Sequence, residues 1–172
     1  MYPILATTLD SIGNLTRQVT AYKLSVFPEI EPLHGGLSVL FNLWTVLRRD
    51  ADMPDAPEFS SHRLAIMAPG LKVTLIDVSD PNPWRFKIIT EHGLVGTRDN
   101  KLVPGQYLVD IACNLRSRAL MRDCMNVRET RRPSYQEVST KIQGVQRRFM
   151  QLTLPLKIDE TTTTIVIGTR KI

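Results

Sequence analysis

The sequence has few of the residues on which catalysis and metal binding usually depend. Its 172 residues include two cysteines and three histidines, and no CxxC or HxxxH spacing indicates a zinc site. No GxxxxGK[ST] or GxGxxG motif is present to hold a phosphate. No serine or cysteine stands in a nucleophile-elbow context with a histidine base. We therefore expect a protein that is not an enzyme and that has no catalytic or metal site.

Long hydrophobic runs and blocks of like charge are also missing. No apolar run approaches the ~20 residues that a membrane-spanning helix needs, and residues 1–5 lack the basic and apolar regions of a secretory signal. These features predict a cytoplasmic protein without membrane contact. The net charge is +5, but lysine and arginine are dispersed, with no run of five. A basic scaffold that binds an anionic partner or nucleic acid is the alternative function, with nucleic acid disfavoured.

The composition that is present is typical of a globular chain, with 42% hydrophobic and 23% charged residues. The length favours one domain with an extension, and residues 1–36 differ from the rest. Their apolar side chains recur every three or four positions, which predicts an amphipathic N-terminal helix. Several threonines and Gly13 weaken this prediction, so a partly ordered arm is the alternative. Residues 37–172 form the main domain.

The clearest helix is predicted for residues 37–49, because apolar side chains cover more than half of its circumference. Val39, Leu43 and Val46 form a second apolar stripe beside the main one. A flat sheet covers only one side of such a helix. The second stripe is therefore covered either within the chain or by a second subunit, and we take Val39, Leu43 and Val46 as the candidate dimer or partner interface.

The remaining pattern predicts two strands, a helical middle region and three further strands. Alternating or continuous apolar residues mark strands, and turn residues separate them. The predicted fold class is α+β, with a five-stranded antiparallel sheet, helices on one of its faces and the N-terminal helical extension. The strands are expected at residues 71–78, 84–88, 134–142, 145–156 and 161–170, and the helical region at 108–127 with a break near Arg118.

Short motifs follow one another in a fixed order over residues 37–169. They are Leu43-Trp44, Leu47-Arg48, Met53-Pro54, Pro69, Ile76-Asp77-Val78, Pro83 to Ile88, Gly105-Gln106-Tyr107-Leu108, Arg132-Pro133 and Leu154-Pro155-Leu156. In this order they resemble the PAS domain, and in particular small PAS-like proteins of alphaproteobacteria whose function is uncharacterised. The chain departs from that family after the second strand, where Thr90-Glu91-His92 replaces a glycine and small residues.

The resemblance implies a non-catalytic sensory or interaction module in signal transduction. Its ligand would lie in a cleft between the sheet and the middle helices. The helix at 37–49 or the N-terminal arm would pass a signal to a regulatory protein partner or across a homodimer. The order Cys113-Asn114-Leu115-Arg116 differs from that of a photoactive flavin site, and His92, the best axial candidate for haem, is more typical of a solvated loop. Haem and flavin are thus disfavoured, and the cofactor stays unknown.

The walls of such a cleft would be apolar side chains from the sheet and the middle helix. The alternative is that the same residues simply fill the core. The candidate ligand-binding residues are Phe86, Ile88, Leu108, Ile111, Leu115, Leu152, Leu154, Ile165 and Ile167.

Overall fold

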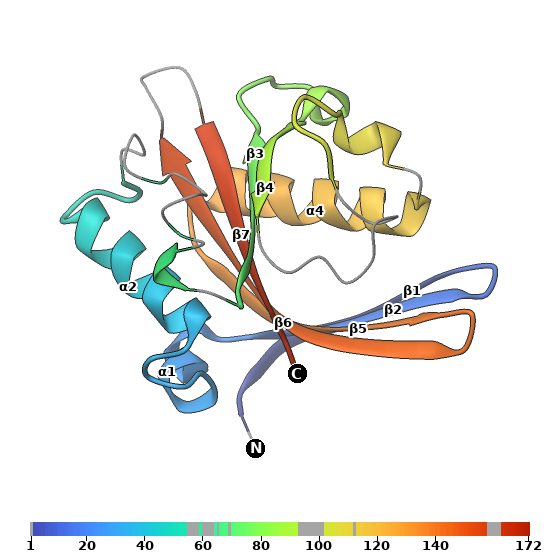
Figure 1. The fold of residues 1–172 in the computed structure, drawn as a ribbon, viewed down its shortest axis with the longest axis horizontal. Helices are drawn as coiled ribbons and strands as arrows, with labels where there is room; N and C mark the ends of the chain where they lie inside the picture. Colours follow the sequence, from blue (N-terminus) through green and yellow to red (C-terminus); the bar gives the residue numbers. More distant parts are fainter. Residues whose placement is uncertain are drawn as a thin grey trace.

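One antiparallel sheet of seven strands organises the part of the chain that the structure describes. The structure is a computed structural model and describes residues 2–54, 59, 64, 66–68, 70–92, 102–111, 113–157 and 163–172. The strand order across the sheet is β1-β2-β5-β6-β7-β3-β4 (Figure 1). The strands are β1 (Ile4–Ile12), β2 (Leu15–Tyr22), β3 (Lys72–Asp77), β4 (Lys87–His92), β5 (Ser134–Ile142), β6 (Val145–Lys157) and β7 (Thr163–Lys171).

The two longest described helices, α2 (Gly36–Arg48) and α4 (Asn114–Thr130), pack on opposite faces of this sheet. Successive residues of a strand point to opposite faces, so neighbouring residues of β7 feed two separate cores, whereas the apolar core residues of β6 all belong to one of them. One core joins the α2 side chains Leu37, Leu40 and Trp44 to Leu152, Leu154 and Val166. The other joins the α4 side chains Cys124 and Val127 to Phe86, Ile88, Ile165 and Ile167.

The predicted fold class is wrong in three respects. The sheet has seven strands and not five, the helices cover both faces, and the N-terminal segment is not a helix. Residues 1–36 contain the hairpin β1-β2 and the four-residue helix α1 (Phe27–Ile30). Threonines that disfavour a helix favour a strand, and Gly13, with φ +58°, makes the hairpin turn. Pairing of β2 with the full length of β5 then overrides the leucine spacing.

Two element boundaries in the middle of the chain also differ from the prediction. Residues Leu108–Asp110 form a 3₁₀ turn (η4), and α4 then runs without the break expected near Arg118. The strand expected from residue 84 begins at Lys87, because Pro83–Arg85 forms a second 3₁₀ turn (η2). The side chain of Asn82 caps this turn by accepting a hydrogen bond from the Trp84 amide at 3.1 Å. The cap leaves Trp84 out of the strand.

Buried polar contacts hold the segment after the β1-β2 hairpin against the sheet. The Glu31 carboxylate is fully buried and accepts hydrogen bonds from the Tyr135 hydroxyl at 2.7 Å and from Arg170 at 2.8 and 2.9 Å. Because a charged partner strengthens a hydrogen bond, these contacts hold α1 against β5 and β7. Phe27 adds an edge-on ring contact with Tyr135 at 4.9 Å between centroids.

The hairpin β1-β2 and the ends of β5 and β6 form an arm that projects beyond the helices (Figure 1). Most of β1 is exposed on both of its faces. The arm contacts α4 through the ion pair between Arg122 and Asp10, at 2.8 Å. The hydrogen bond within this ion pair is the main reason that the pKa of Asp10 is lowered and the pKa of Arg122 is raised.

The two thiols are expected to differ strongly in reactivity. Cys124 is completely buried under α4, and burial raises the pKa of its thiol, whereas Cys113 is only half-buried at the start of the helix. The thiolate is the reactive form, so one thiol per chain should react with Ellman's reagent under native conditions. Two should react in denaturant. Two fast native reactions, or one that persists in Cys113→Ser, would contradict the described burial.

Candidate functional site on the outer face of helix α4

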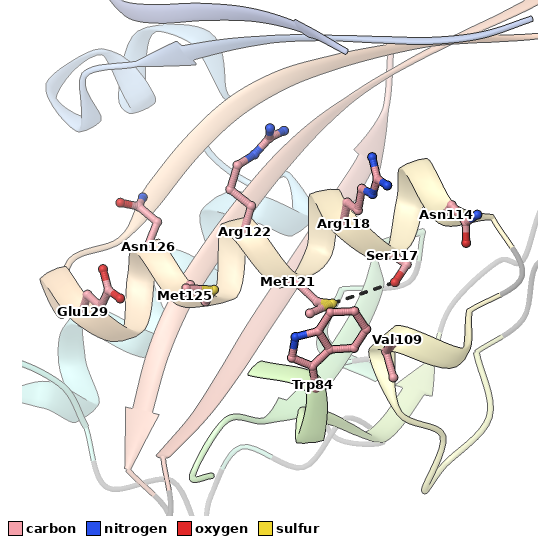
Figure 2. A pocket seen from close by; sticks show the side chains of 10 residues that line it. All are labelled: Trp84, Val109, Asn114, Ser117, Arg118, Met121, Arg122, Met125, Asn126 and Glu129. Carbon is pink, nitrogen blue, oxygen red and sulfur yellow. Dashed lines mark hydrogen bonds between the residues drawn. The ribbon is translucent and has the colours of Figure 1, made fainter. Parts of the chain in front are cut away.

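An open groove of about 670 Å³ lies along the outer face of α4. Figure 2 shows its lining side chains, which come from α4, from η2 and from η4. We call it the α4 groove. It is lined by Trp84, Val109, Asn114, Ser117, Arg118, Met121, Arg122, Met125, Asn126 and Glu129.

The apolar part of the α4 groove combines a tryptophan with a pair of methionines. Met121 and Met125 are four residues apart, so they lie one above the other on the same face of the helix. Trp84 comes from η2, where the Asn82 cap turns the chain outward, and 63% of its surface is exposed. The Ser117 hydroxyl donates a 2.6 Å hydrogen bond to the Leu108 carbonyl, which holds η4 and Val109 against the helix.

The two arginines of the groove lie on the flank of α4 opposite Trp84 (Figure 2). Arg122 is engaged by Asp10 on the arm. Arg118 is exposed and makes no hydrogen bond or ion pair with any residue in the described ranges. Glu129 supplies the one acidic side chain of the lining, near the C-terminal end of the helix. The groove therefore offers an apolar strip beside a cation that is free to pair with a ligand.

A buried polar network holds α4 in place beneath this groove. The Asp123 carboxylate accepts hydrogen bonds from Gln136 at 3.0 Å and Gln151 at 2.9 Å, and its oxygen lies 3.5 Å from Nη2 of Arg17. Nη1 of Arg17 is buried without a hydrogen-bond partner among the described residues. Burial is the main cause that lowers the pKa of Arg17. This network connects the helix to β2, β5 and β6, so the outer face of α4 is a rigid surface.

The side chains of the α4 groove are of types that suit binding. The lining contains no histidine or cysteine, and no group of three or more histidine, cysteine, aspartate or glutamate side chains that could hold a metal occurs within the described ranges. Tryptophan, methionine and arginine are the side chains that are enriched where proteins meet. Methionine adapts its shape to different apolar partners. These properties are those of a docking surface.

The structure places the predicted ligand-binding residues in two separate cores. Phe86, Ile88, Leu108, Ile111, Ile165 and Ile167 come together under α4, where they pack with Cys124 and Val127. Leu115 is also buried on this helix. Leu152 and Leu154 lie on the other face of the sheet, in contact with the α2 core. None of the nine lines the α4 groove.

The three residues of the predicted interface on α2 do not share one environment. Val39 and Leu43 are half-buried and pack against the α2 core. Val46 is 71% exposed. The ring of Phe27 in α1 contacts the ring of Phe41 in a tilted arrangement, at 4.9 Å between centroids, so the N-terminal segment covers part of the wide apolar arc. The chain thus covers two of these side chains internally and leaves the third open to solvent.

Several motif residues that carry the PAS resemblance contact one another in the structure. The Trp44 indole donates a 2.8 Å hydrogen bond to the Pro155 carbonyl, and the amide of Lys157 donates one of 2.9 Å to the Pro54 carbonyl. The Gly105 amide donates a 2.7 Å bond to the Ile88 carbonyl. These residues build the scaffold. His34 is exposed, and the side chain of His92 lies outside the described residues.

Sequence reasoning assigned Trp84 to a strand and did not weigh Met121 and Met125 as a pair. The signal in the sequence was the spacing of four residues between Met121 and Met125, on a helix whose average composition is polar. Met121 and Met125 are half-buried: they pack partly against the core under α4 and also line the groove. The turn residues Asp80-Pro81-Asn82-Pro83, which precede Trp84, could have indicated that this side chain leaves the strand.

The chain matches no protein-family model, and no curated protein or solved structure is similar to it at a significant level. Among the described residues, no helix has both the length and the apolar character needed to cross a membrane.

Proposed function

We propose that this protein is a non-catalytic interaction module that binds a short segment of a partner protein in the α4 groove. The observation that carries this proposal is the exposed Trp84 beside Met121 and Met125. Exposing a large aromatic side chain forgoes the free energy of its burial, on the order of 2 kcal/mol. A tryptophan that is held outward by a capped turn, next to a rigid helix, is well placed to serve as an anchor for a partner.

The groove favours a partner segment that is both apolar and acidic. An apolar face would cover Trp84, Met121 and Met125, and a carboxylate would pair with Arg118. The net charge of +5 also favours encounter with an acidic segment. The 17 residues of α4 give a surface roughly 25 Å long at 1.5 Å per residue. This length suits an amphipathic helix of four or five turns laid along the groove.

A sensory role, which the PAS resemblance implies, adds a requirement to this proposal. The docked segment must bind two states of the module unequally, because only a difference in affinity shifts an equilibrium. The ion pair between Arg122 and Asp10 is the contact that such a segment would alter, since Arg122 lines the groove and Asp10 lies on the arm.

The proposal is tested with two synthetic 16-residue amphipathic peptides that share the same leucine positions. One carries glutamate on its polar face and the other carries lysine. Titration calorimetry with the full chain should show binding of the acidic peptide in the micromolar range and at least tenfold weaker binding of the basic one. Trp84→Ala should weaken binding of the acidic peptide about tenfold or more, as expected for an anchor residue. Arg118→Glu should reverse the preference between the peptides.

The matched control is Leu33→Ala, which truncates a side chain that is 76% exposed and does not line the groove. It should leave both affinities unchanged. Equal binding by the wild type and Trp84→Ala, or no binding of either peptide at millimolar concentration, would refute the proposed site. A salt dependence without any effect of Trp84→Ala would indicate a merely electrostatic scaffold and would also refute it.

A further inference from the structure

Strand β1 forms one edge of the sheet and has strand β2 as its sole strand partner within the described residues. An antiparallel strand uses only half of its backbone N–H and C=O groups on one neighbour. The outer half of these groups in Ile4–Ile12 is therefore available for another strand. Figure 1 shows β1 along one side of the projecting arm, where its Asp10 pairs with Arg122 of α4.

The sequence of β1 lacks the two residue types that most often prevent pairing at an edge. Lysine and proline are the common protective residues, and Ile4–Ile12 contains neither. Its one charged side chain, Asp10, is already paired with Arg122 at 2.8 Å. Apolar side chains are exposed along the strand: Ile4 by 50%, Leu5 by 62% and Leu9 by 70%. An edge of this kind is a docking site for a strand.

We propose that two copies of this chain pair through β1, antiparallel and related by a twofold axis, to join their sheets into one. This interaction goes beyond the proposed function and does not rest on it. A twofold axis brings the same surface of each copy to the interface, so the strand must be complementary to itself. The nine residues of β1 would form an edge pair roughly 30 Å long at 3.4 Å per residue.

The residues of β1 satisfy this requirement when the axis passes through Thr8. Ala6 then lies opposite the partner's Asp10, and Thr7 lies opposite the partner's Leu9. No two like charges face each other. Leu9 of each copy is then a diagonal neighbour of the partner's Leu9 on one face, within reach of side-chain contact. The register of β1 with β2 is regular from Ala6 to Ile12, whereas it shifts between Ile4 and Ala6. With the axis through Thr8, residues 6–10 of the two copies pair entirely within the regular part, and Ile4 lies opposite the partner's Ile12.

The mass of the full chain is measured by sedimentation between 1 and 500 µM. The wild type should form a dimer, and Leu9→Lys should raise the dissociation constant at least tenfold, because it places two cations next to each other across the axis. The matched control is Val46→Lys on α2, an apolar side chain of almost equal exposure, 71% against 70%. It should leave the dimer unchanged. Circular dichroism checks that both variants stay folded.

A second measurement fixes the register of the pairing. In a Cys113→Ser background, Thr8→Cys should form an intermolecular disulfide under mild oxidation, since the Cα atoms of directly opposite residues are about 5 Å apart, within the range that a disulfide spans. A wild type that stays monomeric at 500 µM would overturn the proposal. So would a dimer that dissociates in Val46→Lys but not in Leu9→Lys, because α2 would then be the interface. A monomer that adds an extended peptide of another sequence to β1 would overturn it as well.

Discussion

Glu91→Gln is expected to lower the free energy of unfolding by about 3 kcal/mol, because it removes a buried negative charge that compensates Lys72 and lies beside Arg116. The Glu91 carboxylate is completely buried. It lies 3.5 Å from Nζ of Lys72 and 4.0 Å from Nη2 of Arg116. It also accepts hydrogen bonds from the Thr74 hydroxyl at 3.1 Å and the Leu102 amide at 3.3 Å. The carboxylate thus joins β3, β4 and α4.

The expected loss stands at the lower end of the range of about 3–5 kcal/mol for a broken buried ion pair. The side chains of Lys72 and Arg116 are 25% and 29% exposed, so water can partly solvate them after the change. The double variant Glu91→Gln, Lys72→Met should recover part of the lost stability, since it also removes the cation of Lys72 that Glu91 no longer compensates. If the loss of stability in the double variant equals the sum of the losses in Glu91→Gln alone and Lys72→Met alone, the Glu91–Lys72 pair is not coupled.

The deficit of Glu91→Gln is also expected to shrink as the pH rises above neutrality. Burial, followed by the charge of Arg116, lowers the pKa of Lys72, and Glu91 opposes this shift. Without the Glu91 charge the pKa of Lys72 falls further. A pKa that is lower in the folded state means that the unfolded state binds more protons between the two pKa values, so stability rises with pH there. Glu91→Gln therefore gains more stability than the wild type does when the pH rises above neutrality.

Urea unfolding at pH 7 and pH 9.5 measures both effects, and the difference between wild type and variant cancels contributions from other groups. The control is Glu129→Gln, which neutralises an exposed carboxylate of α4 and should change stability by less than about 0.5 kcal/mol at either pH. A deficit of Glu91→Gln that is equally small, or that grows with pH, would show that the carboxylate does not compensate Lys72 and Arg116.

The C-terminal half of the sheet was the part of the fold that the sequence predicted best. The expected strands 134–142, 145–156 and 161–170 compare with Ser134–Ile142, Val145–Lys157 and Thr163–Lys171 in the structure. Gln143 and Gly144 both have positive φ, at 49° and 79°, which is the geometry of a tight two-residue hairpin. Local turn chemistry and alternation fixed these strands, because both signals lie within a few residues.

The N-terminal hairpin was missed because its stability comes from distant residues. Leu15–Tyr22 pairs with residues 135–142, more than a hundred positions away. Such pairing is not visible in local periodicity, and the leucines of residues 5–15 fit a helical spacing by coincidence. Helices on both faces were missed for a related reason: the buried β7 carries apolar side chains toward both faces, a pattern that local reading does not separate.

The α4 groove could not be predicted as a site because its members come from distant positions. Trp84 and Met121 are brought together by η2 and α4, and their approach depends on how α4 packs on β3 and β7. The predicted cleft residues share an apolar character that a core and a ligand pocket have in common. Composition does not distinguish the two, whereas packing does: six of these side chains fill the space under α4.

Trp44→Ala should have the largest effect of a single apolar truncation, a loss of about 4 kcal/mol in the free energy of unfolding. Removal of a buried large aromatic side chain costs about 3–5 kcal/mol, and Trp44 is only 4% exposed in the α2 core. Its indole donates to the Pro155 carbonyl at 2.8 Å. Strand β5 pairs with β6 only as far as Thr153. The Pro155 carbonyl lies beyond this point, and the Trp44 indole takes the place of a strand as its hydrogen-bond donor.

Trp44→Phe separates the two contributions, because it keeps most of the apolar volume and removes the hydrogen bond. It should cost about 1–3 kcal/mol, the range for leaving a buried polar group unpaired. The control is Trp84→Ala, the same substitution at a tryptophan that is 63% exposed, with an expected change below about 0.5 kcal/mol. Urea unfolding of the three variants measures these losses. If Trp84→Ala destabilises the chain as much as Trp44→Ala does, then Trp84 is part of the core, and the docking surface on α4 does not exist as described.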